Sequence, residues 1–143
     1  MRIVVCVLLI VHGLITAALS AGRFNTSGPG GPNPKLLDWW PTPFGKSWIF
    51  SLLGHQQSGI VEPVAGLLWL VAGAALIAAA LGLFGFVVPT TYWRALAGAG
   101  ALVALVLFVV YAHPYDAIGI GADIAILLVL LWAKWPSPQI LGS

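Results

Sequence analysis

Apolar residues fill four long stretches of the chain, and polar residues gather in the connections between them. A helix that rises about 1.5 Å per residue needs about 20 apolar residues to cross a hydrocarbon core of roughly 30 Å. The apolar stretches are continuous and do not alternate with polar residues, which favours helices over barrel strands. We therefore predict an all-α, four-helix transmembrane bundle with spans at about residues 3–21, 64–88, 95–112 and 118–133.

The composition agrees with a membrane environment. Hydrophobic residues make up 60% of the sequence and charged residues only 7%, far from the balance of a soluble domain. We expect residues 1–143 to form a single integral membrane domain in contact with the lipid bilayer. The formal net charge of +2 is too small to indicate a nucleic-acid partner.

The first stretch has some features of a secretory signal peptide, because Arg2 precedes an apolar run that ends in small residues. The run is longer than a usual signal core, so we expect it to be retained as a span. Cys6, the single cysteine, lies inside this span and has no cysteine within the chain with which to form a disulfide.

Positive charges close to span ends favour a cytoplasmic location for both termini in a multi-pass cell-membrane protein. With the N-terminus inside, Arg2, Arg94 and Lys134 all lie inside and flank spans closely, whereas Arg23 is the only outer cation that does so. The four acidic residues then fall in the outer half: Asp38, Glu62, Asp116 and Asp123.

Small residues at four-residue spacing should let the helices approach one another closely. Ala74, Ala78 and Gly82 form such a series in the second span, and Ala117, Gly121 and Ala125 form one in the fourth. The same chemistry serves packing within one chain and packing against other membrane protein subunits. The sequence leaves both alternatives open.

The connection at residues 22–61 is too long for a simple turn between helices, and we expect it to be an extracytoplasmic, partly helical loop. Residues 25–34 are rich in glycine and proline and should be irregular. Residues 47–54 predict a short helix closed by Gly54. Two interpretations of the aromatic part remain open, a lid over the bundle and a simple anchor at the membrane interface. Its tryptophans are Trp39, Trp40 and Trp48.

Polar residues at membrane depth are the candidates for a ligand pocket, because such groups usually face the bundle interior and need partners. His12 and Asp123 should approach each other in the outer half, with Glu62 and Asp116 nearer the mouth. His113, which precedes the fourth span, should also point toward the outer half. Three interpretations compete: a structural His–Asp hydrogen bond, a pocket for a small or lipid-like ligand, and proton relay or redox chemistry. Glu62 and Asp116 also suit the positive N-terminal ends of helices.

Other site signatures are missing from the sequence. The spacing of histidine, cysteine and acidic residues predicts no metal site, and neither a phosphate-binding loop nor a nucleophile elbow is present. These absences favour a protein without catalytic activity of its own. The residues by themselves predict no cofactor.

Three short segments carry a resemblance to a known group: His12-Gly13-Leu14-Ile15, residues 66–70, and Asp116 with residues 119–127. They resemble small four-helix membrane proteins of the broad DoxX-like kind, many of which are uncharacterised. The resemblance implies a bacterial inner-membrane location. Some members of the broader group are linked to quinone-coupled oxidation of sulfur compounds. For this chain the resemblance therefore implies a quinone as one candidate ligand. Thr16 stands where some relatives carry a second histidine.

Two functional hypotheses follow from these features. The leading one is a non-catalytic membrane subunit or accessory protein that binds a partner, a lipid or a quinone-like ligand. The alternative is a small membrane redox or transport component that uses the intramembrane pair of His12 and Asp123.

Overall fold

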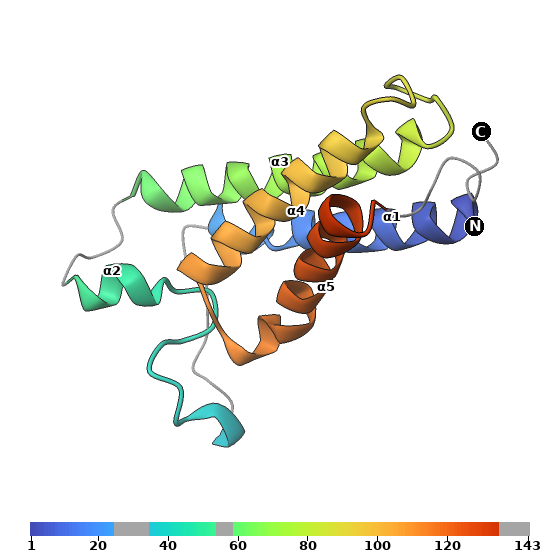
Figure 1. The fold of residues 1–143 in the computed structure, drawn as a ribbon. Coiled ribbons are helices and arrows are strands. Elements are labelled where there is room, and N and C mark those ends of the chain that lie inside the picture. Colours follow the sequence, from blue (N-terminus) through green and yellow to red (C-terminus); the bar gives the residue numbers. More distant parts are fainter. Residues whose placement is uncertain (25–34, 54–58, 135–143) are drawn as a thin grey trace.

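Helices form all the regular secondary structure in the part of the chain that the computed structural model describes, which comprises residues 1–24, 35–53 and 59–134 (Figure 1). The four longer helices are α1 (Arg2–Ala18), α3 (Val61–Gly82), α4 (Trp93–Val110) and α5 (Ala117–Leu127). The short α2 covers Trp48–Leu52. Three 3₁₀ turns and one π-helical turn complete the set: η1 (Ala21–Arg23), η2 (Lys35–Leu37), η3 (Pro114–Asp116) and η4 (Leu128–Trp132).

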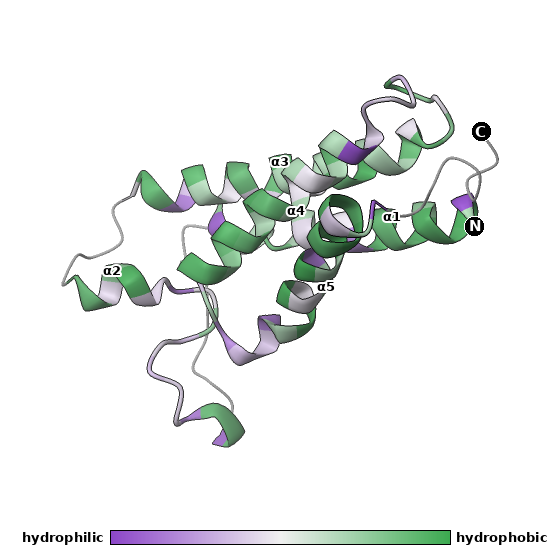
Figure 2. Cartoon of the chain, in the orientation of Figure 1, coloured by the Kyte–Doolittle hydropathy of each residue, from purple (hydrophilic) through white to green (hydrophobic). Residues whose placement is uncertain are grey.

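Three helical segments are long and apolar enough to cross a membrane: Val61–Gly82, Trp93–Val110 and Pro114–Trp132. The last of these joins η3, α5 and η4 into one continuous segment. The α1 helix is also apolar, but at 17 residues it is shorter. Figure 2 shows hydrophobic residues along all four of these helices, with hydrophilic residues concentrated near helix ends and in the connections. These helices support the membrane location that the sequence predicts.

The observed helix ends differ from the predicted ones. The first helix ends at Ala18, and the helix predicted to run to residue 88 ends at Gly82. Gly85 follows with a φ of 74°, a left-handed conformation that glycine adopts readily, and Val87 has a φ of 70°. The chain therefore leaves the helical conformation there, although its residues are still apolar. Gly54 and residues 25–34, about which predictions were made, lie outside the described residues.

The helices pack in a sequential order. α1 lies against α3, α3 against α4, and α4 against α5, whereas α1 and α5 have little direct contact. The ring centroids of Trp69 and Phe108 lie 4.8 Å apart at the α3–α4 contact. Large side chains such as Leu67, Val106 and Leu131 are exposed on the outside, which suits surfaces that face lipid.

Glycines set the closest helix crossing, between α1 and α3. A Cβ added at Gly73 would lie 2.5 Å from the carbonyl oxygen of Gly13 and 2.7 Å from the Cβ of Ala17. Two of the small residues that the sequence predicts to pack between helices do not do so. Ala74 is exposed, and a Cβ added at Gly121 would have no neighbour within 4 Å among the described residues. The contact face of α3 is rotated away from Ala74, and Gly121 faces outward from α5.

The α1–α3 crossing predicts a steep cost for one added methyl group. Gly73→Ala should lower the free energy of unfolding by about 1–3 kcal/mol, because the new Cβ overlaps backbone and not a flexible side chain. The measurement is equilibrium unfolding of the purified chain in mixed micelles. Gly98→Ala is the matched control, since a Cβ there has open space, and it should be neutral or stabilising by up to about 1 kcal/mol. Equal effects of the two variants would contradict the close crossing.

Candidate functional site

His12 of α1 and Asp123 of α5 form a hydrogen bond between the two helices that otherwise barely touch. Their Nε2 and Oδ1 atoms are 2.7 Å apart. The Asp123 side chain is fully buried, and the His12 side chain is 13% exposed. The proximity that the sequence predicts for these two residues is confirmed. Its role in ligand binding or in structure stays a prediction.

The local structure explains why this pair is needed. Among the described residues of α5, Asp123 is the only buried one. A carboxyl group in an apolar interior is costly unless it is hydrogen-bonded, and His12 is the partner that α1 supplies. The bond therefore anchors the middle of α5 to α1.

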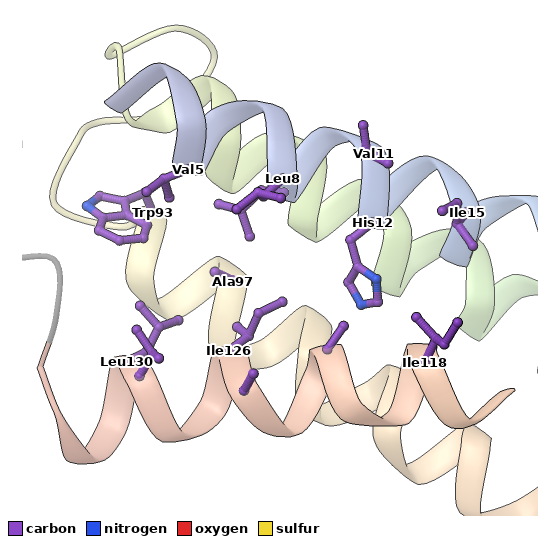
Figure 3. A pocket seen from close by; sticks show the side chains of 14 residues that line it. Val5, Leu8, Val11, His12, Ile15, Trp93, Ala97, Ile118, Ile126 and Leu130 are labelled. Carbon is purple, nitrogen blue, oxygen red and sulfur yellow. The ribbon is translucent and has the colours of Figure 1, made fainter. Parts of the chain in front are cut away.

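A cavity of about 470 Å³ runs between α1 and α5 beside this pair, and we call it the α1–α5 groove (Figure 3). Val5, Leu8 and Ile15 line its α1 side, and Ile118 and Ile126 line its α5 side. Its wall also includes Trp93 of α4, at the end that Val5 lines. Among the described residues His12 is the only ionisable one in the wall. The groove is thus an apolar surface with one polar group, a usual composition for a small-molecule site.

Two buried polar atoms near the pair have no hydrogen-bond partner among the described residues. They are Oδ2 of Asp123 and Oγ1 of Thr16, and both side chains are completely buried. Thr16 lies one turn after His12 on α1. This four-residue spacing could have predicted that the two side chains share one face of the helix. From the sequence alone, Thr16 was singled out only because some relatives carry a histidine at its position.

Glu62 belongs to a second polar cluster and not to the groove. Its Oε2 atom lies 2.8 Å from an Nη atom of Arg23, which also donates to the backbone carbonyl of Gly45. The guanidinium carbon of Arg23 lies 3.8 Å from the ring centroid of Tyr111. Glu62 does not line the α1–α5 groove, and its position at the mouth of a pocket with His12 stays a prediction. Arg23 was missed as a partner, although opposite charges at the adjoining ends of two neighbouring spans were a usable signal.

The environment of Tyr111 reflects the same cluster. Burial raises the pKa of its hydroxyl, the nearby Glu62 carboxylate raises it further, and Arg23 opposes both effects. Asp116 is close enough to Arg23 for an electrostatic interaction. Asp116 precedes α5, but its side chain makes no capping hydrogen bond there. This cluster ties η1, α3 and the end of α4 together.

His113 is buried among aromatic rings of the connection and does not line the α1–α5 groove. Its ring centroid lies 5.2 Å from that of Phe44 and 5.0 Å from that of Tyr115. Its Nδ1 accepts a hydrogen bond from the Tyr115 amide, and burial lowers its pKa. His113 therefore contacts the loop in this structure, and its role in a ligand pocket stays a prediction.

The aromatic loop segment docks on the C-terminal end of α4. Trp48 Nε1 donates to the carbonyl of Val109, Ser47 Oγ to that of Val110, and Trp40 Nε1 to that of Ala112. The last carbonyls of a helix have no partners within the helix, so these bonds satisfy them. Trp39 stays 68% exposed and packs edge-on against Trp40. No described loop residue lines the groove, so this segment caps α4 and is not a lid over the groove.

Comparison with known proteins adds no relative. No protein family model, no curated protein and no solved structure matches this chain. The DoxX-like resemblance therefore stays a prediction. Within the described residues, no three histidine, cysteine or acidic side chains are grouped so that they could hold a metal ion.

The docking of the loop predicts that the Ser47 hydroxyl stabilises this segment and that the Ser51 hydroxyl does not. Ser47 is buried and also accepts a bond from the Phe50 amide at the start of α2. Ser47→Ala should lower the local stability of residues 35–53 by about 1–2 kcal/mol. Faster amide hydrogen exchange in this segment would show the loss. Ser51→Ala, an exposed position on the same helix, is the control and should leave exchange unchanged. Unchanged exchange in Ser47→Ala would refute the docking.

Proposed function

We propose that this chain is a non-catalytic, four-span membrane protein that binds a lipophilic ligand in the α1–α5 groove. The observation that carries the proposal is the single polar pair, His12 with Asp123, beside an otherwise apolar cavity of about 470 Å³. Ligand pockets commonly fall between roughly 300 and 1,000 Å³ and combine apolar walls with few polar groups. A lipid or a quinone-like molecule has this combination of properties.

The proposed fourth span is α1 together with its continuation. After Ala18 the chain keeps turning, because the Leu19 amide bonds to the Ile15 carbonyl and the Ser20 amide to that of Ala17. The turn η1 then leads to Arg23. Close packing of α1 on α3 supports a membrane-spanning position beside it.

The distribution of charge supports cytoplasmic termini and an extracytoplasmic loop at residues 22–61. A guanidinium nitrogen of Arg94 donates to the carbonyl of Lys134 at 3.1 Å, which brings the start of α4 beside the end of η4. Arg2 begins α1, and none of the three is accompanied by an acidic residue near its helix end. Glu62 and Asp116 lie near the opposite helix ends. A cationic side facing the cytoplasm follows the usual rule for membrane proteins.

The alternative, a redox or transport component, would use the same pair of residues. A proton relay needs a chain of ionisable groups or water, and His12 is the only ionisable residue among the described residues that line the groove. Glu62 is paired with Arg23, and His113 is buried in the loop contact. This separation favours ligand binding over proton transfer. Another membrane protein subunit could occupy the same face and is an outcome of the test.

Native mass spectrometry of the full chain in mild detergent tests the proposal. The wild type should carry a bound lipophilic molecule. Ala125→Phe fills the groove and should lose it, whereas Ala74→Phe, exposed on α3 and outside the groove, should keep it. The double variant His12→Leu with Asp123→Leu should fold, because apolar residues can replace a buried pair, yet should bind less.

Three outcomes would contradict the proposal. The wild type could carry no lipophilic molecule, or Ala125→Phe could retain it unchanged. A protein partner lost from Ala125→Phe and kept by Ala74→Phe would instead make the groove a subunit contact.

A further inference from the structure

We infer that the α1–α5 groove selects an uncharged, long-chain carbonyl compound, whose carbonyl oxygen accepts a hydrogen bond from Nδ1–H of His12. The inference rests on the proposed function, because it requires a lipophilic ligand in the groove. It adds the chemical class of that ligand and the direction of the hydrogen bond.

The proton on Nδ1 follows from the charge of the pair. A net charge in an apolar interior is costly, so the pair of His12 and Asp123 is favoured with a total charge of zero. Two arrangements have that charge and place the shared hydrogen between Nε2 and Oδ1. Either a histidinium faces a carboxylate, or a neutral carboxylic acid donates to Nε2 of a neutral imidazole. In both arrangements Nδ1 carries a hydrogen, because Nε2 is committed to Asp123. A third, in which Nε2–H donates to Oδ1 and the acid hydrogen sits on Oδ2, would bury that hydrogen without an acceptor among the described residues, which disfavours it.

The geometry leaves this donor open to the groove. His12 makes one side-chain hydrogen bond among the described residues, the one from Nε2 to Asp123. Its ring is partly exposed and lines the cavity, and Figure 3 shows it projecting from α1 into the space between the helices. Asp123 does not line the cavity, so its unpartnered Oδ2 does not meet the ligand. The groove therefore presents the Nδ1–H donor of His12, and a ligand that carries a hydrogen-bond acceptor would complement it.

The depth of His12 below the end of α1 determines which compounds with a hydrogen-bond acceptor can reach it. His12 lies six residues before Ala18, or about 9 Å below the end of α1, and the groove runs from Ile15 past His12 and Leu8 to Trp93. Glycerolipid esters are held near the interface by their polar headgroups. A ketone or quinone carbonyl without a charged headgroup can reach His12, with its hydrocarbon chain lying along the groove toward Trp93.

The experiment compares a long-chain methyl ketone with the alkane of equal length on the full chain in nanodiscs. The wild type should bind the ketone about tenfold more tightly, the gain expected from one hydrogen bond. His12→Phe keeps a ring without the donor and should bind both compounds equally. The infrared carbonyl stretch of ¹³C-labelled ketone should move to lower frequency on binding to the wild type.

Each remaining outcome has a distinct meaning. If neither compound binds the wild type, the proposed function fails as well. If both bind equally, the groove stands and the carbonyl inference falls. A glycerolipid ester that displaces the ketone at equal concentration overturns the depth argument. Nitrogen-15 spectra of wild-type His12 need no variant, and an unprotonated Nδ1 would overturn the inference outright.

Discussion

The hydrogen bond between His12 and Asp123 is the constraint on which the arrangement of α5 depends. Asp123 is the one buried residue among those described in α5, and its carboxyl group reaches across to His12 of α1. The two helices have little other contact, so a space remains between α1 and α5 on either side of this hydrogen bond. That space is the α1–α5 groove. A polar contact between the two helices and an apolar cavity beside it therefore arise from the same geometry.

The other end of the helices is held by different interactions. Arg23 joins Glu62, Tyr111 and the loop carbonyl of Gly45, while loop side chains bond to the last carbonyls of α4. Arg23, Glu62 and Tyr111 therefore contact one another and do not add polar groups to the wall of the groove. Buried charge is thus concentrated where it fixes helix ends, and the groove keeps a single polar group.

Sequence patterns predicted the helices and the pairing of His12 with Asp123, because long apolar runs and isolated polar residues at membrane depth have few alternatives. The same reasoning did not predict the pairing of Glu62 with Arg23, since a one-dimensional pattern does not show which of several nearby ions is the partner. It also missed the bonds from Trp48 to α4, which depend on how the loop folds back. The groove itself depends on the angle between α1 and α5, and no residue spacing encodes that angle.

The contact between His12 and Asp123 in a bilayer is the feature most directly open to measurement. Solid-state NMR can measure the dipolar coupling between Nε2 of ¹⁵N-labelled His12 and the ¹³C-labelled carboxyl carbon of Asp123. With Nε2 and Oδ1 2.7 Å apart, the account predicts a strong coupling that disappears in His12→Phe. Absence of coupling in the wild-type protein would contradict the account, because α5 would then not be anchored to α1 through this pair and the groove would lose its polar wall.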